Sequence, residues 1–442
     1  MSRRRWAVGV AGAAAASTAL LRRRSERRVA FPPGDDAIHA EAAMGAAGAL
    51  LAEPVVRRRH LAMPLAPSVS ASVEPLLHGR RYFPRMLDDI AAARDHVHLL
   101  IYGYKPGDIG STFRDALAAK VAEGVTVRLQ VDAIGSEMDF GSKALFAELL
   151  SAGVQIVGHD GVFVLRRGQL GARTPAGRLE DILHFDHRKM AVIDGMVGYV
   201  GGSGIEDHYT DERFYDVMCR VTGPVVAQLQ LVFLASWRHE GGAIPADEPL
   251  ERSFPAAALD VPPGVEPIPT TVLWNVPGTG HHPISDAIEA SLEAATERID
   301  IVNPYISNRA ILVRLLDAAR RGVTVRLIAP GKPTPPYPAA AFRHHYGRLM
   351  DAGVEILLHP EMAHAKVLRI DDRVLVGGCN LDDLSLFRND ELDVLFEHPS
   401  MPALAESTVF AELAAMSTRA AASTGRRERA WNAAMDRVSR LL

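Results

Sequence analysis

The hydrophobic pattern of the chain repeats itself. Residues 95–129 and 298–327 each begin with an apolar run typical of a strand, pass through a polar loop into a helical pattern, and end in Gly-Val-Thr-Val-Arg-Leu. Downstream, Ala-Gly-Val-Gln-Ile at 152–156 matches Ala-Gly-Val-Glu-Ile at 352–356. Strands that alternate with amphipathic helices indicate an α/β fold in which helices cover a largely buried sheet. The repeat therefore predicts two α/β lobes of common plan.

Each predicted lobe continues into the same polar motif, His-x-Lys-x4-Asp. The two copies consist of His187, Lys189 and Asp194, and of His364, Lys366 and Asp371. In both copies apolar residues lead from the lysine to an acidic turn, and a second apolar run follows, which predicts a β-hairpin. Because side chains alternate along a strand, the histidine and the lysine share one face. Each hairpin thus presents an imidazole beside a fixed cation.

Lysine is scarce in this chain, which makes its presence in both motifs informative. The sequence has only six lysines and relies on arginine for most of its positive charge. Residue frequencies give on the order of 0.0001 expected chance occurrences of two such motifs. The competing interpretation, two hydrogen-bonded histidines on unrelated strands, is therefore disfavoured.

At these motifs the chain resembles the phospholipase D superfamily, whose members carry one copy in each of two lobes. Shorter matches resemble the bacterial cardiolipin synthase branch; they lie at 108–110, 132–136, 186–189, 303–305, 364–366 and 377–382. The resemblance covers residues 77–399. It implies two pseudo-twofold-related lobes, each a mixed sheet flanked by helices, with the active site at the lobe interface.

Composition and pattern divide the chain into six expected segments. Nearly half of the residues are hydrophobic, so a large core can be buried in two or three domains. We expect a basic and apolar N-terminal segment at 1–28, a linker at 29–74 with one short helix near 39–51, a first lobe at 75–245, an inter-lobe linker at 246–270, a second lobe at 271–399, and two C-terminal helices within 400–442. The first lobe has an insertion at 161–182 before its motif, which we expect at the rim of the cleft.

The charge of the chain is unevenly distributed. The first thirty residues carry a formal charge of +7, so the remainder carries −11 within a total of −4. An acidic body disfavours nucleic acid as a partner, because proteins that bind it usually present a basic surface.

Residues 6–21 form an uncharged run between two arginine clusters, slightly shorter than a typical membrane span. A membrane anchor, a helix lying on the membrane surface, a cleaved export signal and a soluble arm all stay open. The arginines after the run favour the anchor or the surface helix, because basic clusters tend to stay cytoplasmic. We expect a cell-membrane location, a membrane surface as partner, and a catalytic body in the cytoplasm.

The paired motifs contain the groups that phosphodiester exchange requires. One neutral imidazole can attack phosphorus and form a phosphohistidine, while the other protonates the leaving alkoxide and then deprotonates the acceptor. Lys189 and Lys366 would hold the non-bridging oxygens as point charges. The resemblance implies that His187 is the nucleophile and His364 the acid and base.

Further residues are expected to support the two histidines. Asp216 and Glu391 follow their histidines at similar distances, and the resemblance implies that these carboxylates orient the imidazoles. Asp194 and Asp371 belong to the catalytic motif by resemblance, although their position in acidic turns predicts that they cap turn amides.

The glycine-rich segments after the motifs differ between the lobes. Residues 377–380 read Gly-Gly-Cys-Asn, whereas 201–204 read Gly-Gly-Ser-Gly. We expect Asn380 to bind phosphate, with Ser203 and Ser385 as additional donors. The first lobe has glycine at position 204, where the resemblance implies asparagine.

No metal or other cofactor is expected for this chemistry. The adjacent histidines at 281–282 and 344–345 have no Cys or Asp cluster nearby that would complete a metal site. The two cysteines, Cys219 and Cys379, are expected to be small buried side chains rather than a disulfide.

The sequence thus predicts a phosphatidyltransferase that resembles cardiolipin synthase and acts on phosphatidylglycerol through a phosphohistidine. A hydrolase of the same superfamily, acting on phospholipid or nucleic acid, is the first alternative. A scaffold that has lost turnover is the second, suggested by the glycine at position 204.

Overall fold

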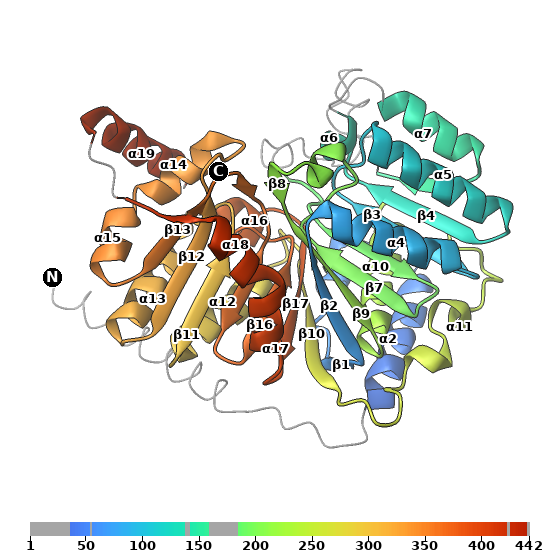
Figure 1. The fold of residues 1–442 in the computed structure, drawn as a ribbon. Helices are drawn as coiled ribbons and strands as arrows, with labels where there is room; N and C mark the ends of the chain where they lie inside the picture. The colour runs from blue at the N-terminus through green and yellow to red at the C-terminus, as the bar shows by residue number, and fades with distance from the viewer. Residues whose placement is uncertain (1–35, 54, 138–141, 159–183, 422–424, 440–442) are drawn as a thin grey trace, which may run out of the picture.

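The structure, a computed structural model, describes residues 36–53, 55–137, 142–158, 184–421 and 425–439 (Figure 1). The N-terminal segment at 1–28 and the insertion at 161–182 lie outside the described residues, so the predictions made for them stay predictions. Within the described ranges, no helix has the length and hydrophobicity needed to cross a bilayer.

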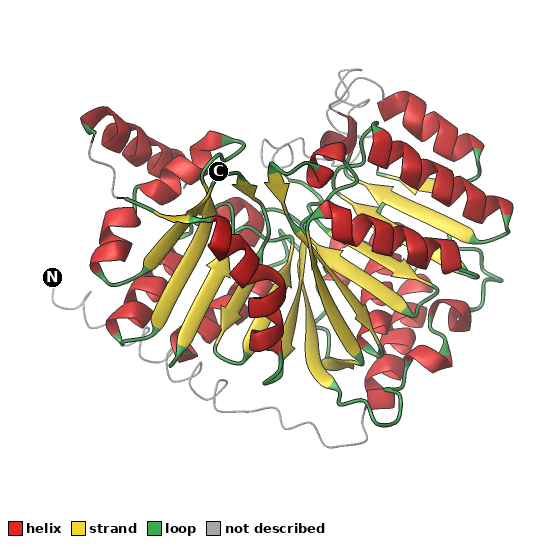
Figure 2. Cartoon of the chain, in the orientation of Figure 1, coloured by secondary structure: helices red, strands yellow, loops and turns green. Residues whose placement is uncertain are grey.

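Two mixed sheets with the same strand order form the framework (Figure 2). The first contains, in spatial order, β2 (Ser72–Leu77), β9 (Val217–Thr222), β7 (Val197–Gly201), β6 (Lys189–Ile193), β3 (His96–Ile101), β4 (Thr126–Val131) and β5 (Gln155–Val157). The second contains β10 (Ile268–Asn275), β17 (Glu391–Glu397), β16 (Arg373–Gly377), β15 (Val367–Ile370), β11 (Arg298–Val302), β12 (Thr324–Pro330) and β13 (Glu355–His359), with β1 (Ser68–Ser70) and β18 (Thr418–Arg419) at its edges.

Strand directions also match between the sheets. β3, β4 and β5 are parallel, as are β11, β12 and β13, whereas the remaining neighbours are antiparallel. Both motif hairpins form as predicted, from β6 and β7 and from β15 and β16. The predicted α/β class, with two like mixed sheets flanked by helices, is confirmed.

The helices complete three apolar clusters. The outer face of the first sheet is covered by α4 (Gly79–Ala92), α5 (Asp108–Ala122) and α7 (Ser142–Ser151). The outer face of the second is covered by α12 (Pro283–Ala294), α13 (Arg309–Arg320) and α15 (Tyr346–Asp351). The third cluster joins the inner faces of both sheets around α10 (Val225–His239), which is apolar on nearly all sides and buried over residues 225–237. This shared core holds the two halves together.

The short helix predicted near 39–51 forms, but the rest of the predicted linker at 29–74 is also largely folded where the structure describes it, which corrects the sequence interpretation. It contains α2 (Asp36–Leu51), α3 (Arg58–Leu61), β1 and the start of β2. Ala43, Ala47 and Leu50 of α2 are buried in the shared core, and α2 packs against α10. Small alanine side chains at helical spacing give only a weak hydrophobic pattern, so this packing was not visible in the sequence.

The C-terminal segment is helical in two stretches, separated by a strand that was not predicted. α17 (Met401–Ala405), a π-helical turn η3 (Glu406–Phe410) and α18 (Ala411–Met416) form the first stretch. β18 then adds to the edge of the second sheet, and α19 (Arg426–Ser439) packs against α14 (Pro336–Arg343).

Candidate active site

Short backbone pairings bring each motif to the opposite half of the molecule. The Asp390 amide donates to the Phe185 carbonyl, and the His187 amide donates to the Asp390 carbonyl, both at 3.0 Å. In the same way β14 (Met362–Ala363) pairs with β8 (Phe214–Tyr215), and the His364 amide donates to the Tyr215 carbonyl at 2.7 Å. Both histidines therefore lie at the junction between the halves.

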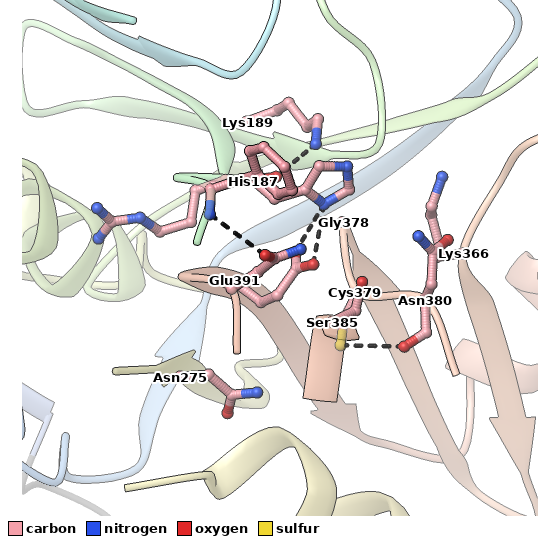
Figure 3. Close-up of polar contacts among 12 residues, drawn as sticks. His187, Lys189, Asn275, Lys366, Gly378, Cys379, Asn380, Ser385 and Glu391 are labelled. Atoms are coloured by element: carbon pink, nitrogen blue, oxygen red, sulfur yellow. Dashed lines mark hydrogen bonds and ion pairs between the residues drawn. The ribbon is translucent and has the colours of Figure 1, made fainter. Parts of the chain in front are cut away.

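The imidazole–carboxylate pairs are crossed between the halves. His187 Nδ1 lies 2.9 and 3.1 Å from the two carboxylate oxygens of Glu391 (Figure 3). His364 Nδ1 lies 2.6 Å from Asp216 Oδ2. Chain order had associated each acid with the histidine of its own lobe, whereas the structure pairs it with the other. The carboxylates are fully buried, and the imidazole side chains keep 14% and 13% exposure, which leaves both rings accessible to substrate.

Both lysines lie against their histidines. Lys189 donates to the His187 carbonyl, and its Nζ lies 4.8 Å from the centre of the Tyr102 ring. Lys366 Nζ lies 2.8 and 2.9 Å from the His364 ring nitrogens. Burial lowers the pKa of Lys189 to about 7 and that of Lys366 to about 8.

The charges of both lysines act on both imidazoles, so the four side chains lie within electrostatic reach of one another. Burial lowers the pKa of His187, and the charges of Lys189 and Lys366 lower it further. Burial lowers the pKa of His364 to about 3, again assisted by both lysines, while Asp216 opposes the shift. Both imidazoles are therefore neutral near pH 7, which is the form that a nucleophile or base requires.

The two carboxylates differ in charge state. The His364 and Lys366 contacts outweigh burial and hold the pKa of Asp216 below its ordinary value, so this acid is ionised and accepts the His364 Nδ1 proton. Burial raises the pKa of Glu391 to about 8, although both lysines oppose this. The Asp216–His364 dyad is a neutral imidazole with an anion. In the Glu391–His187 dyad the pKa of the carboxyl is raised and that of the imidazole is lowered.

Asp194 and Asp371 accept hydrogen bonds from backbone amides, which confirms the prediction that they cap amides and corrects their assignment as catalytic residues. Asp194 accepts hydrogen bonds of 2.8–2.9 Å from the amides of residues 94–96. Asp371 accepts bonds of 2.8–3.0 Å from the amides of residues 296–298. Each aspartate lies seven residues along an extended strand from its histidine, a distance of about 20 Å. Their role is to join each hairpin turn to the start of the neighbouring strand.

We predict that Asp194→Ala lowers stability and leaves turnover intact. Three backbone amides lose their acceptor, and the residue has a positive φ of 51°, so the free energy of unfolding should fall by about 1–3 kcal/mol. Thermal unfolding and turnover per folded molecule measure the two effects, with Asp194→Asn as the milder control. Normal stability with turnover reduced by about a thousandfold or more would contradict this structural role.

Of the three expected phosphate-binding side chains, only Asn380 is available. Its side chain is more than nine-tenths buried, and Oδ1 has no hydrogen-bond partner among the described residues. The Ser203 hydroxyl donates to the Gly204 carbonyl and accepts from Tyr82, both at 2.8 Å. Ser385 is buried and hydrogen-bonds Glu391. The two serines already have protein partners, which corrects the expectation that they bind phosphate.

Two further expectations concerned metals and cysteines. Among the described residues, no group of three or more His, Cys, Asp or Glu side chains is arranged to hold a metal ion. Cys219 and Cys379 are both free and buried, as predicted.

Sequence reasoning missed an ion network around the buried Asp390. Arg58 Nη2 donates to both Asp390 carboxylate oxygens at 2.7 Å, and its Nε donates to the Pro277 carbonyl at 2.8 Å. His184 Nε2 lies 2.9 Å from Asp390 Oδ2. Since Asp390 directly precedes Glu391 and its carbonyl accepts the His187 amide, the network fixes both members of that dyad. Arg58 comes from the segment expected to be a linker, so nothing in the sequence pointed to it.

We predict that Arg58→Met lowers turnover about tenfold with little change in KM, because Glu391 and His187 lose their fixed geometry while the substrate contacts remain. Steady-state kinetics measure the effect, and Arg58→Lys should restore part of the rate. The exposed neighbour Arg57, replaced by Met, is the matched control. Equal rates for the Arg58 and Arg57 variants would refute the positioning role.

The chain is similar to known proteins over most of its length. Residues 288–413 match the family described as "Cardiolipin synthase, PLD-like domain". The major cardiolipin synthase ClsA of Bacillus subtilis is 31% identical over 335 residues, which is 73% of this chain and 64% of the relative. Cardiolipin synthase 1 of Bacillus anthracis is 28% identical, over 73% of this chain and 62% of the relative. In both cases the match spans less than two thirds of the relative's own length.

Solved structures show the same fold. The phosphatidylserine synthase of Haemophilus influenzae Rd KW20 aligns with a TM-score of 0.63 and 13% identity, covering 87% of this chain and 97% of the other. The polyphosphate kinase of Porphyromonas gingivalis aligns with a TM-score of 0.51 and 12% identity, covering 88% and 55%. At these identities the likeness concerns architecture alone.

Proposed function

Because the chain belongs to the phospholipase D superfamily, we propose that it is a phosphatidyltransferase that converts two phosphatidylglycerol molecules into diphosphatidylglycerol and glycerol. The observation that carries the proposal is the pair of crossed imidazole–carboxylate dyads with two buried lysines between the halves. The similarity to cardiolipin synthases supports the choice of substrate.

The first proposed step transfers the phosphatidyl group to the protein. His187 Nε2 attacks phosphorus, the bond between phosphorus and the headgroup oxygen breaks, and His364 gives its Nε2 proton to the departing glycerol alkoxide. Lys189 and Lys366 hold the non-bridging oxygens as charge develops there. The bound phosphodiester anion offsets the two lysine charges, and Asp216 stabilises the His364 imidazolium, so His364 can carry the proton it needs.

The second proposed step reverses these roles. The hydroxyl of a second phosphatidylglycerol gives its proton to His364 and attacks phosphorus, and the phosphorus–nitrogen bond to His187 breaks. The protein returns to its starting protonation state. Water as the acceptor would give phosphatidic acid instead, so the acceptor that enters the site determines the product.

The proposed partners are a phospholipid and the membrane surface that contains it. The N-terminal arginines would attract anionic lipid and hold the catalytic body on the cytoplasmic side of the cell membrane. Nucleic acid is an improbable substrate, since the acidic body would repel its phosphates.

Mass spectrometry of lipid products tests the proposal. Purified protein is incubated with vesicles of phosphatidylglycerol, with vesicles of phosphatidylcholine, and with single-stranded DNA, with His187→Ala as the inactive control. We expect diphosphatidylglycerol and glycerol from the phosphatidylglycerol vesicles, and no product from phosphatidylcholine or DNA. Phosphatidic acid as the only product would identify a hydrolase, and cleavage of DNA without lipid turnover would identify a nuclease.

We predict that kcat/KM falls as pH rises above about 7. The pKa values of Lys189 and Lys366, about 7 and about 8, mean that the ammonium forms are lost in this range and with them the charge that binds the phosphodiester. The decline should approach tenfold per pH unit for each lysine that must be charged, roughly. Initial rates between about pH 6 and pH 10 measure it, and Lys366→Arg should make the decline above about pH 8 shallower, because only Lys189 then loses its charge. A flat profile to about pH 10 would contradict the prediction.

A further inference from the structure

The two halves differ in one place beside the active site. In the second half, Asn380 follows the glycines, with Asp382 two residues later; in the first half the equivalent positions are Gly204 and Glu206. A Cβ on Gly204 would lie 2.6 Å from the Gly103 carbonyl oxygen and 3.0 Å from Glu206 Oε1. The Gly103 carbonyl and the Glu206 carboxylate thus occupy the space that an asparagine side chain would need.

Glu206 belongs to a group of three polar side chains that the mechanism above does not use. Lys105 Nζ lies 3.0 Å from Glu206 Oε2, and His208 Nδ1 lies 3.4 Å from the same oxygen. Their side chains are 29%, 11% and 41% exposed in the order Lys105, Glu206 and His208. We name these three residues the Glu206 cluster. It is mostly enclosed and still reachable by a ligand.

Aromatic side chains connect the Glu206 cluster to both histidines. On one side, the His208 ring lies 4.4 Å from Phe214, whose ring lies 5.1 Å from His364. On the other side, the Tyr102 ring lies 4.8 Å from His187. Tyr102 directly precedes Gly103, where a Cβ would lie only 2.4 Å from Glu206 Oε1, so Glu206 lies beside this part of the chain. The cluster therefore borders the space in which the headgroups react.

We propose that the Glu206 cluster is the subsite for the acceptor alcohol and that it selects a polyol headgroup of the glycerol type. The hydroxyl that attacks phosphorus needs only the His364 imidazole, whereas a second hydroxyl needs its own hydrogen-bond partners. The Glu206 carboxylate can accept from that hydroxyl, and the Lys105 ammonium or the His208 imidazole can donate to it. This inference rests on the proposed function and identifies the residues that would choose the acceptor.

The charge balance of the cluster favours a neutral headgroup over a cationic one. Glu206 is already paired with the Lys105 ammonium, so an incoming ammonium group would find little uncompensated negative charge. A neutral polyol can still bind, because Glu206 can accept a further hydrogen bond and Lys105 can donate one while the two remain paired. An aminoalcohol headgroup is therefore the less suitable acceptor.

An acceptor competition tests the subsite. Phosphatidylglycerol vesicles are incubated with protein and equal concentrations of deuterated glycerol, ethanol and ethanolamine, and the labelled phosphatidylglycerol, phosphatidylethanol and phosphatidylethanolamine are quantified by mass spectrometry. The parent protein should favour glycerol. Glu206→Gln should lower the glycerol-to-ethanol product ratio about tenfold and leave ethanol transfer unchanged. Because both products come from the same folded molecules, the ratio does not depend on the yield of folded variant.

Glu212→Gln is the matched control, since that carboxylate is 76% exposed and pairs only with Arg80 among the interactions seen in the described residues. Four outcomes would each overturn the proposed subsite. In Glu206→Gln, the product ratio could stay unchanged, or glycerol and ethanol transfer could fall equally. The parent protein could show no preference for glycerol, or it could show a preference for ethanolamine that depends on Glu206. Glycerol selectivity that depends on Glu206 without any diphosphatidylglycerol would refute the proposed function and retain the subsite. Diphosphatidylglycerol synthesis with a glycerol-to-ethanol product ratio insensitive to Glu206 would support the proposed function and refute the subsite.

Discussion

With phosphatidyl-p-nitrophenol as substrate, His364→Ala protein should release a stoichiometric burst of nitrophenolate and then stop, whereas His187→Ala protein should release none. Nitrophenolate leaves without a proton, so the acid is dispensable in the first step. His187 can then attack phosphorus, and the phosphohistidine persists because no base activates the acceptor. Without His187 the first step has no nucleophile.

Stopped-flow absorbance measures the burst, and acid-labile, base-stable phosphate on the protein identifies the intermediate. On the natural substrate, both variants should lose about 10⁴ or more in turnover, because each step needs both imidazoles. A burst from His187→Ala but not from His364→Ala would show that His364 is the nucleophile and His187 the acid and base. A burst from neither would exclude a phosphohistidine intermediate.

The local features of this site were predictable because they depend on short-range pattern. The His-x-Lys spacing on a strand places both side chains on one face, and the hairpins formed where the acidic turns indicated them. The rise per residue of a strand also places Asp194 at the turn of its hairpin, far from His187. The strand rise alone therefore argued against a catalytic Asp194, in agreement with its contacts to the amides of residues 94–96.

Long-range relations were not predictable from a single sequence. Glu391 lies 204 residues from His187, while Asp216 is far closer in the chain, so chain order associates the wrong acid with each histidine. Arg58 is 332 residues from Asp390, and its helix precedes the repeated region. These contacts depend on how the two halves pack around α10, which the periodicity of either half does not specify.

The crossed dyads themselves give the second large effect. Replacing Asp216 by Asn should approach the His364→Ala behaviour, with a burst followed by slow turnover, because the Asp216 carboxylate, 2.6 Å from His364 Nδ1, stabilises the imidazolium form of His364. Replacing Glu391 by Gln should approach the His187→Ala behaviour, with the burst rate lowered by about 10²–10⁴, because the glutamine NH2 can donate to His187 Nδ1 and the tautomer is then no longer fixed.

The two amide variants are each other's control, since both remove a fully buried carboxylate next to a lysine and an imidazole. General destabilisation would slow both phases in both proteins alike. If each carboxylate instead served the histidine of its own half, Asp216→Asn would abolish the burst and Glu391→Gln would preserve it. The kinetic phase that each variant loses therefore shows which half supplies the carboxylate for each histidine. Because the carboxylate comes from the opposite half, each chemical step depends on how the two repeats pack together.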